Sequence, residues 1–425
     1  MIYISVGSNL GNRLNNIRTS LELIKSFNIL TNIKHSIVLE TTAIVEESAP
    51  NEFNIPYLNI IISGETNLSP ENLLQKLKEI ELIMGRTQSD QRWAPRIIDL
   101  DILLFNDLVL DTKNLKIPHP ELKNRPFFQN LLSLIGAPKA IYSNQELKNL
   151  NNSFTKSFVL NPAFVGVVNL TKDSFSDGGK FDYADDAVKQ ITKLISDGAS
   201  VIELGAQSTR PNAEIVGEVE EYNKLNEVLA NISNLIKKKN IQISIDSFWP
   251  SVTLKLIRKQ HKISIINDVR GEFDTMTLAE ISESKCKFCI MHSLTAPVNP
   301  EIIIPQGYDP IEVIQKWGKG VLDKLYKIGF SEKDVIIDPG IGFGKSAYQN
   351  IKILKEIEKL KSLNAPIMVG HSRKSYIKTF SNFEAKDRDI ETIAVSAYLY
   401  KKVDFLRVHN VEDHMRFLAG YEVFS

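Results

Sequence analysis

The first 105 residues alternate between two hydrophobic spacings, one typical of strands and one typical of helices. Short apolar runs predict four strands, at residues 2–6, 33–39, 58–62 and 97–105. Apolar residues at helical spacing predict a helix over residues 14–24 and a second one between the N-cap Ser69 and the terminator Gly85. The order strand, helix, strand, strand, helix, strand predicts a ferredoxin-like α+β domain.

Eight further apolar runs follow in the second part of the chain, separated mostly by stretches with helical periodicity. The runs are residues 164–170, 201–204, 241–245, 263–266, 288–291, 335–337, 367–369 and 405–408. Eight strands that alternate with helices over a domain of about 250 residues are typical of the (β/α)8 TIM barrel. We therefore predict an N-terminal ferredoxin-like domain followed by a TIM barrel.

A polar, asparagine-rich segment over residues 142–157 separates the two patterns and shows little periodicity. We place the domain boundary there. The predicted division is a first domain over residues 1–150, a linker over residues 151–158 and a barrel domain over residues 159–425.

The composition is that of a globular protein with a sizeable core, with 43% hydrophobic and 24% charged residues. The 51 basic and 51 acidic residues leave no net charge, so nothing draws the whole molecule to nucleic acid or to a membrane surface. No apolar run is long enough for a membrane span or a signal peptide, and we expect a cytoplasmic protein.

The two cysteines, Cys286 and Cys289, form a C-x-x-C pair. Such a pair can carry out redox chemistry or provide two of the ligands of a zinc site. Here it falls in an apolar run that reads as a strand, where the two side chains would point to opposite faces. We expect two buried thiols in a reducing compartment.

The stretch "DPGIGFGKS", Asp338 to Ser346, looks at first like a phosphate-binding loop. A P-loop needs a glycine where this chain has Pro339, which has no amide hydrogen to offer a phosphate. An ATP-dependent ligase or a GTPase built on this run stays as a weak alternative. The stretch is better explained as the end of a barrel strand and its loop, in which Lys345 would add positive charge near the barrel mouth.

Polar residues stand at the carboxyl end of each predicted barrel strand, while the interiors of the runs are apolar. Barrel enzymes carry their chemistry at these strand ends. The positions are Asn169, 205–211, Asp246, Asn267, Asp268, His292, Asp338, 371–375, Arg407 and His409. Asp246 and Asp338 could instead cap helices, and His292 is expected to be a packed residue.

In the first domain, "RWAPRIIDLDILLF" places Asp99 and Asp101 two apart on a strand, so both face the same side. Adjacent carboxylates repel unless a cation lies between them, and hard oxygen ligands suit Mg²⁺. Arg86, Arg92 and Arg96 precede them and suit phosphate binding. Taken alone, the pair fits a solvated strand face with surface ion pairs equally well. Trp93, which could stack on a heterocycle, favours a phosphoryl-transfer site.

These residues belong to a set of motifs that resembles the 6-hydroxymethyl-7,8-dihydropterin pyrophosphokinase family. The motifs are "GSNLGN" (7–12), "YLN" (57–59), "IELIMGR" (80–86), "RWAPRIIDLDILLF" (92–105) and "IPHPELKNRPFF" (117–128). The resemblance covers the whole first domain. It implies transfer of pyrophosphate from ATP to the hydroxymethyl group of the pterin, which leaves AMP.

The resemblance also implies roles for single residues of this chain. Asp99 and Asp101 would hold two Mg²⁺ on the triphosphate, while Arg86 and Arg96 would neutralise charge on the transferring group. ATP would be contacted by Glu81, Arg92, Trp93, His119 and Arg125, and the pterin by Asn59, Trp93 and Phe127. Gln88 and Ala94 depart from the family pattern, which has Arg and Gly at these positions.

A second set of motifs resembles dihydropteroate synthase along the whole barrel domain. The motifs are "VNLTKDSFSDGG" (168–179), "GAQSTRPNA" (205–213), "ISIDS" (243–247), "IINDVRG" (265–271), "DPGIGFGK" (338–345), "GHSRKS" (370–375) and "LRVHNV" (406–411). The two families catalyse consecutive steps, because the second replaces the pyrophosphate of the pterin with p-aminobenzoate. A fused, bifunctional enzyme of folate synthesis is then chemically sensible.

The second resemblance likewise implies a site, with one Mg²⁺ on Asn169 and a homodimer through the barrel domain. Pyrophosphate would be bound by Asn169, Arg407 and His409, and the pterin by Asp246, Asn267, Asp338 and Lys374. Lys374 and Arg407 would be catalytic. p-Aminobenzoate would be enclosed by Phe175, Thr209, Arg210, Pro211, Phe343 and Ser375. Lys172 and Gln207 depart from the family pattern. A rival hypothesis is that only one of the two domains is an active enzyme and that the other is a structural or dimerising module.

Overall fold

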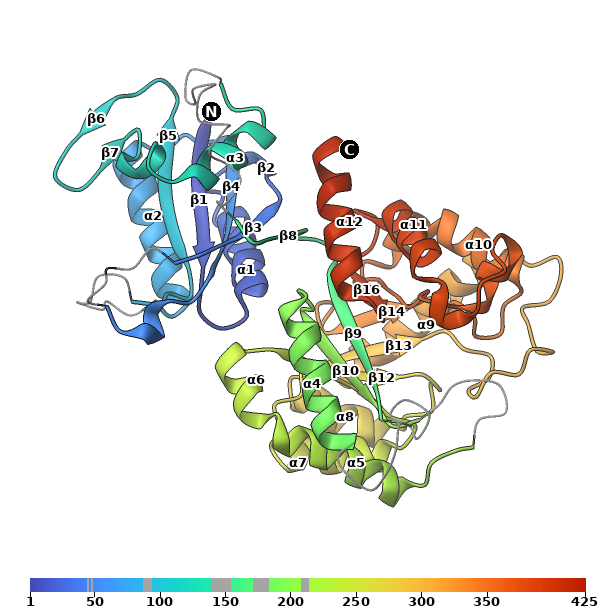
Figure 1. The fold of residues 1–425 in the computed structure, drawn as a ribbon. Helices are drawn as coiled ribbons and strands as arrows, with labels where there is room; N and C mark the ends of the chain where they lie inside the picture. The colour runs from blue at the N-terminus through green and yellow to red at the C-terminus, as the bar shows by residue number, and fades with distance from the viewer. Residues whose placement is uncertain (44–45, 47–48, 87–93, 139–153, 171–182, 208–213) are drawn as a thin grey trace. The chain divides into compact units, whose positions relative to one another are not determined.

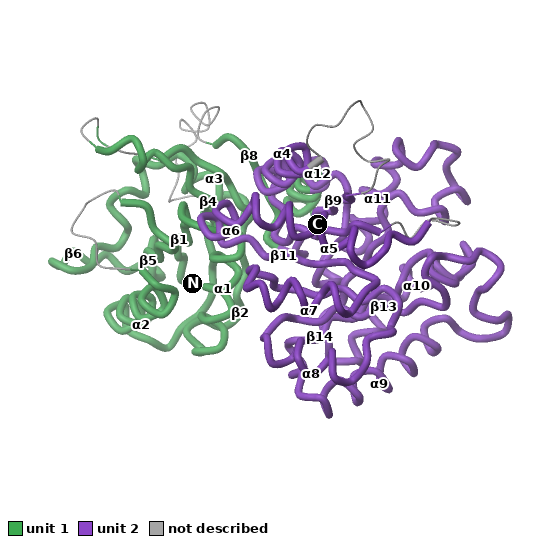
Figure 2. The backbone as a smooth tube through the Cα atoms, turned by 90° about the horizontal axis from the view of Figure 1, so that it is seen from below, with its two compact units in different colours: residues 1–160, 415–425 green, residues 161–414 purple. Residues whose placement is uncertain are grey.

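The computed structural model of the chain describes residues 1–43, 46, 49–86, 94–138, 154–170, 183–207 and 214–425. Its elements are drawn in Figure 1. The chain divides into two compact units, residues 1–160 with 415–425 and residues 161–414, which Figure 2 shows in separate colours. No helix in the described ranges is both long and apolar enough to cross a membrane.

The first unit is built on a mainly antiparallel sheet with strand order β5-β1-β4-β3-β8, and β2 also pairs with β4. Its strands are β1 (Ile2–Ser8), β2 (Thr31–His35), β3 (Val38–Thr41), β4 (Tyr57–Glu65), β5 (Asp99–Phe105) and β8 (Lys156–Phe158). A separate small ribbon joins β6 (Leu110–Asp111) and β7 (Lys116–Ile117). The helices are α1 (Arg13–Ser26), α2 (Pro70–Ile83) and α3 (Pro126–Leu134). This confirms the predicted ferredoxin-like plan.

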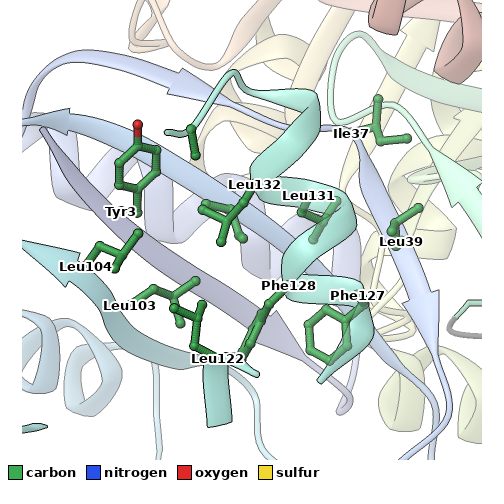
Figure 3. Close-up of a cluster of buried hydrophobic side chains, with 12 residues drawn as sticks. Tyr3, Ile37, Leu39, Leu103, Leu104, Leu122, Phe127, Phe128, Leu131 and Leu132 are labelled. Atoms are coloured by element: carbon green, nitrogen blue, oxygen red, sulfur yellow. The ribbon is translucent and has the colours of Figure 1, made fainter. Parts of the chain in front are cut away.

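Helix α3 packs on one face of this sheet through a buried apolar cluster (Figure 3). Phe128, Leu131 and Leu132 of the helix lie against side chains of β1 and β5, among them Leu103. Complete burial of such side chains contributes roughly 1.5–3 kcal/mol each to folding. The cluster therefore fixes the start of α3, and with it the segment that leads from His119 to Phe127.

Two details of this sheet differ from the sequence pattern. The run at residues 33–39 forms two strands, because the Ser36 hydroxyl and backbone interrupt the ladder by bonding Ile61. Residues 156–158, predicted as the end of a linker, form strand β8, which pairs with β3 in the first unit's sheet. The predicted domain boundaries themselves remain a prediction.

The second unit is a barrel of eight parallel strands. They are β9 (Ala163–Asn169), β10 (Val201–Gly205), β11 (Gln242–Asp246), β12 (Ile265–Asp268), β13 (Lys287–Met291), β14 (Val335–Asp338), β15 (Met368–Val369) and β16 (Phe405–Val408). Neighbours in sequence pair in register, β16 returns to β9, and a bridge between Ile337 and Ile367 closes the ring. All eight strands lie at the predicted runs, and the predicted TIM barrel is confirmed.

Helices follow the strands around the barrel (Figure 1). They are α4 (Tyr183–Ser196), α5 (Glu218–Asn231), α6 (Ser233–Lys239), α7 (Pro250–Arg258), α8 (Thr275–Glu283), α9 (Pro310–Ile328), α10 (Ala347–Lys355), α11 (Asp389–Leu399) and α12 (Val411–Phe424). Inside the barrel a buried apolar layer includes Val165, Val201 and Cys289, and it forms the floor beneath the polar strand ends. Cys286 and Cys289 are both free and buried, as predicted.

Candidate active sites

The first unit contains a hollow of about 250 Å³ at the ends of β1, β3, β4 and β5. Seven of the residues predicted for the first site line it: Asn59, Arg96, Asp99, Asp101, His119, Arg125 and Phe127. These residues lie up to 68 positions apart in the sequence. The fold therefore gathers the polar and aromatic groups that the motifs predicted into one concave site.

Asp99 and Asp101 face the same side of β5, opposite Gly7 and Ser5 of β1. The Asp99 carboxylate accepts hydrogen bonds from Arg86 Nη1 at 2.8 Å and from Arg96 Nη1 at 3.1 Å. Burial favours the neutral acid, but these two arginines outweigh it and lower the pKa of Asp99. Asp99 is therefore held as a carboxylate.

Asp101 has weaker contacts with described cationic side chains than Asp99 has. Its closest described cation is Lys78, with Nζ 3.9 Å from Oδ1. Burial, followed by the charge of Asp99, raises the pKa of Asp101. A divalent cation between the two carboxylates would relieve this repulsion, because its attraction favours the ionised form of both.

The carboxylate pair fits Mg²⁺ that is shared with a substrate. Among the described residues no group of three or more His, Cys, Asp or Glu side chains forms a complete metal site. Mg²⁺ usually keeps several waters and binds through one or two carboxylates plus substrate phosphates. Asp99 and Asp101 supply that donor set, and Arg96 beside them suits phosphate oxygens.

Glu81, predicted to contact ATP, lies on α2 with only 2% of its surface exposed. Its Oε1 accepts the backbone N–H of Leu100 at 2.7 Å and an ammonium hydrogen of Lys78 at 2.8 Å. Its other oxygen pairs with Arg86. This arrangement favours a role in holding Arg86 toward Asp99 over contact with the nucleotide, because the carboxylate is already surrounded by protein donors.

Aromatic and amide groups also line the hollow. Phe127 packs against Phe128 with ring centroids 4.4 Å apart, and the Arg125 guanidinium lies 5.7 Å from the Phe128 centroid. Asn59 is 5% exposed and donates to the Thr41 hydroxyl at 2.8 Å. An amide and a flat ring in one hollow suit a planar heterocycle with polar edges.

Sequence reasoning missed Tyr57, which also lines this hollow. Burial, followed by the charge of Asp99, raises the pKa of its phenol, so it is a neutral hydrogen-bonding group. A signal was present in the sequence, because Tyr57 stands two residues before Asn59 and a strand places both on one face.

At the mouth of the barrel, Arg407 of β16 joins polar groups from three other strands. Its Nη1 donates to Asp338 Oδ2 at 2.6 Å, and its Nη2 donates to Asn267 Oδ1 at 3.1 Å. The Nη2 also donates to Glu203 Oε2 at 3.0 Å, and Nε lies 2.8 Å from Glu203 Oε1. Asn267 in turn donates to Asp246 at 3.3 Å, so four of the predicted residues form one network.

Glu203 is the member of this network that sequence reasoning missed. It is 3% exposed, projects from β10 and also accepts a hydrogen bond from Ser244 at 3.1 Å. Its signal was a carboxylate within the apolar run 201–204, since buried acids are rare unless they are paired. Its partner, Arg407, lies 204 residues away, so the sequence alone does not show the pairing.

Burial, together with the charge of Glu203, raises the pKa of Asp246 to about 7. The folded state therefore favours the protonated acid, and this group's contribution to stability is lost as pH rises from about 4 through about 7. We expect Asp246→Asn, which cannot titrate, to gain stability relative to the parent over this range, by roughly a few kcal/mol. Denaturant unfolding at pH 5 and pH 8 checks this, and a parallel pH dependence of the two proteins would contradict it.

Lys374 and Phe343 lie against each other at the same mouth. Lys374 Nζ is 4.4 Å from the Phe343 ring centroid, a distance typical of a cation–π contact. Burial lowers the pKa of Lys374 to about 8. Ser375, at the start of the next 3-10 helix, and His409, after β16, are both exposed. Asn169 ends β9 opposite Gly205 and is partly exposed.

Lys345 differs from expectation, because it is buried rather than a free charge near the mouth. Its ammonium donates to three backbone carbonyls. Six of the predicted site residues lie outside the described residues: Arg92, Trp93, Phe175, Thr209, Arg210 and Pro211. The same holds for the variant positions Gln88 and Lys172, whereas Gln207 is described and bonds both backbone groups of Val216.

The comparison with protein families finds two matches in the order of the two units. Residues 3–136 match 7,8-dihydro-6-hydroxymethylpterin-pyrophosphokinase, and residues 165–409 match pterin binding enzyme. A folate synthesis bifunctional protein from Chlamydia muridarum is 36% identical over 99% of this chain and 97% of its own length. Another from Arabidopsis thaliana is 32% identical over 97% of this chain and 94% of its own length.

Solved structures similar to the barrel are dihydropteroate synthases. The one from Anaplasma phagocytophilum, with bound 6-hydroxymethylpterin-monophosphate, is 32% identical, with a TM-score of 0.54. It covers 62% of this chain and 96% of its own. The one from Xanthomonas albilineans with 4-aminobenzoic acid is 26% identical, with a TM-score of 0.56, and covers 62% and 93%.

Proposed function

The chain belongs to the family of bifunctional folate synthesis proteins, and from this premise we propose how its residues carry the two reactions. It is a transferase with two activities. One transfers pyrophosphate from ATP to 6-hydroxymethyl-7,8-dihydropterin, with AMP as the second product. The other condenses the pterin pyrophosphate with p-aminobenzoate to 7,8-dihydropteroate and releases pyrophosphate.

The observation that carries the first assignment is one hollow that contains the carboxylate pair of β5 together with Arg96, Asn59 and Phe127, with Arg86 and Arg96 both bonded to Asp99. We assign ATP phosphates to the side of Arg86 and Arg96, and the pterin to Asn59 and Phe127. Asp99 and Asp101 would hold Mg²⁺, which supplies charge neutralisation on the phosphates when it is bound. Two ions at this site remain a proposal.

In this arrangement the protein acts mainly by position and charge. Arg86 and Arg96 would stabilise negative charge as the bond from the β-phosphorus to the leaving AMP breaks. His119 and Arg125 line the same hollow and would contact the nucleotide. Glu81 would act indirectly, because it holds Arg86 from behind.

In the barrel we assign the pterin to Asp246, Asn267, Asp338 and Lys374. Support comes from the relative solved with a pterin monophosphate and from the network that links three of these residues to Arg407. Each nitrogen of the Arg407 guanidinium already contacts a protein side chain. We therefore propose that Arg407 acts chiefly by holding Asp338 and Asn267, and that Asn169 and His409 meet the pyrophosphate.

The chemistry of the second step suits such a site. Loss of pyrophosphate from the pterin would leave a methylene cation, which the amine of p-aminobenzoate then attacks. The buried Asp338 carboxylate near the pterin would stabilise positive charge, so no strong base is required for the ionisation. Phe343 and Ser375 would border p-aminobenzoate, in line with the relative solved with 4-aminobenzoic acid.

We expect Lys374→Ala to reduce dihydropteroate formation by roughly ten- to a hundredfold, because a charge-assisted hydrogen bond to the pterin is lost. AMP formation from ATP and the hydroxymethylpterin should stay within about twofold of the parent. Separate assays of each half-reaction check this. Loss of both activities in a folded variant would contradict two independent sites, and a parent that lacks one activity would support the rival with a single working head.

Three further assignments rest on resemblance and position. We propose one Mg²⁺ at Asn169, a homodimer through the barrel domain, and a cytoplasmic location. One similar Arabidopsis protein is named as mitochondrial, so location varies among relatives. The substrates are small molecules, and we propose no nucleic-acid or membrane partner.

A further inference from the structure

Lys345 lies in the loop that follows β14 and is 7% exposed. Its Nζ donates to the carbonyls of His292 at 3.0 Å, Gly340 at 2.9 Å and Phe343 at 2.7 Å. An ammonium group has three hydrogens and no acceptor, so the three carbonyls use all of its donors. Burial lowers the pKa of Lys345 to about 7, as expected for a cation that has left water.

The three carbonyls come from two different barrel loops. His292 follows β13, where its ring packs edge-on against Trp317, while Gly340 and Phe343 follow β14. The two loops approach so closely that a Cβ on Gly340 would lie 2.0 Å from the His292 carbonyl oxygen. Lys345 therefore fastens one loop to the other at a point where three carbonyl oxygens converge, of which only that of Gly340 accepts a further described backbone hydrogen bond, from Phe343 at 3.0 Å.

Helix α10 holds the outer side of the same loop. Asn350 accepts the backbone N–H of Gly342 at 2.8 Å and donates to the Lys345 carbonyl at 3.2 Å. The Phe343 ring then packs with Phe248, Val269 and Met291, and its face meets Lys374 Nζ. The position of the ring thus depends on a loop in which the Lys345 ammonium supplies three of the hydrogen bonds.

We infer that Lys345 is a positioning residue of the synthase site, which sets the Phe343 ring at the place where p-aminobenzoate binds. This rests on the proposed function, in which Phe343 borders p-aminobenzoate. Lys345 itself faces backbone carbonyls and need not touch a substrate. Its removal should therefore act on p-aminobenzoate more strongly than on the pterin, because three of the four proposed pterin partners, Asp246, Asn267 and Lys374, lie outside β14 and its loop.

The test compares Lys345→Met, which keeps the length of the side chain but has no donor, with Lys345→Gln, which keeps two donors. We expect the KM for p-aminobenzoate to rise roughly tenfold or more in the methionine variant and by less in the glutamine variant. The KM for the pterin pyrophosphate should change by less than about threefold. The matched control is Lys352→Met, on the same helix-loop segment, which removes only a surface ion pair with Asp309.

The double variant Lys345→Met with Phe343→Ala distinguishes a displaced Phe343 ring from a general loss of structure in the barrel. If Lys345 acts through the ring, Lys345→Met should add little to the KM effect of Phe343→Ala. An unchanged KM for p-aminobenzoate with a lower kcat would overturn the inference, and so would additive effects in the double variant. Fluorescence of Trp249 and Trp317 reports that the barrel of each variant is folded, and if the methionine variant does not fold, the glutamine variant decides by the same criterion.

Measurements on the parent enzyme distinguish a failure of the proposed synthase function from a failure of the positioning role of Lys345. If the parent forms no dihydropteroate from the pterin pyrophosphate and p-aminobenzoate, the proposed function fails. If the parent is active and the Lys345 variants keep its KM values, only the positioning role fails.

Discussion

Asp101→Ala is expected to abolish AMP formation, with a loss on the order of a thousandfold in kcat. Asp101 and Asp99 share one face of β5, and the pKa of Asp101 is raised because burial and its neighbour disfavour its charge. The Asp101 carboxylate would be a ligand of the bound cation. Removal of this carboxylate would weaken cation binding and take away several kcal/mol of stabilisation of the transferring phosphates. The second reaction should continue when pterin pyrophosphate is supplied.

The assay measures AMP from ATP and hydroxymethylpterin, and dihydropteroate from pterin pyrophosphate and p-aminobenzoate, in separate reactions. Asp111→Ala serves as the matched control, because Asp111 is exposed and its ion pair within the described part of the chain is with Lys116 at the surface. It should leave both rates within about twofold. If Asp101→Ala also lost the second reaction while remaining folded, the two sites would not be separate.

Arg407→Met is expected to have the largest effect on the barrel. The change leaves the buried carboxylates of Glu203 and Asp338 without their shared cation. Breaking a buried ion pair from one side typically costs about 3–5 kcal/mol, because the remaining charge stays unpaired. We expect a loss of this order in the stability of the barrel, together with loss of dihydropteroate formation.

Denaturant unfolding followed by tryptophan fluorescence measures this loss, with Trp249 and Trp317 as probes within the barrel. Arg258→Met is the control, since Arg258 forms an exposed pair with Glu280 and its removal should cost at most about 1 kcal/mol. Adding Glu203→Gln to Arg407→Met should restore part of the stability, because one unpaired charge is removed. No recovery in the double variant would mean that Glu203 is not the group left unpaired.

Much of the architecture could be predicted because its signals are local. The eight barrel strands are short apolar runs bounded by polar residues, and such runs depend on neighbours in sequence. The pair Asp99 and Asp101 could be placed on one face because strand side chains alternate with period two. The gathering of strand-end residues at one mouth followed from the parallel order of the strands.

The features that could not be predicted depend on contacts between distant segments. Glu203 meets Arg407 only once the barrel closes, and Glu81, whose carboxylate is bonded to Leu100 and Arg86, is not among the residues that line the hollow. Lys345 is a lysine in a glycine-rich loop, for which sequence alone suggests a free charge. Two of its carbonyl partners, Gly340 and Phe343, lie in a turn whose geometry glycine permits, and the third, His292, comes from the loop after β13, which the sequence pattern does not place beside it.

The central claim, that one chain carries both reactions in sequence, is tested most directly with ATP labelled at its β-phosphate. The full-length protein is incubated with this ATP, Mg²⁺ and 6-hydroxymethyl-7,8-dihydropterin, and p-aminobenzoate is added afterwards. We predict unlabelled AMP and labelled pterin pyrophosphate first, and labelled free pyrophosphate with an equal amount of dihydropteroate after the addition. Formation of labelled ADP, or release of pyrophosphate that does not depend on p-aminobenzoate, would contradict the account.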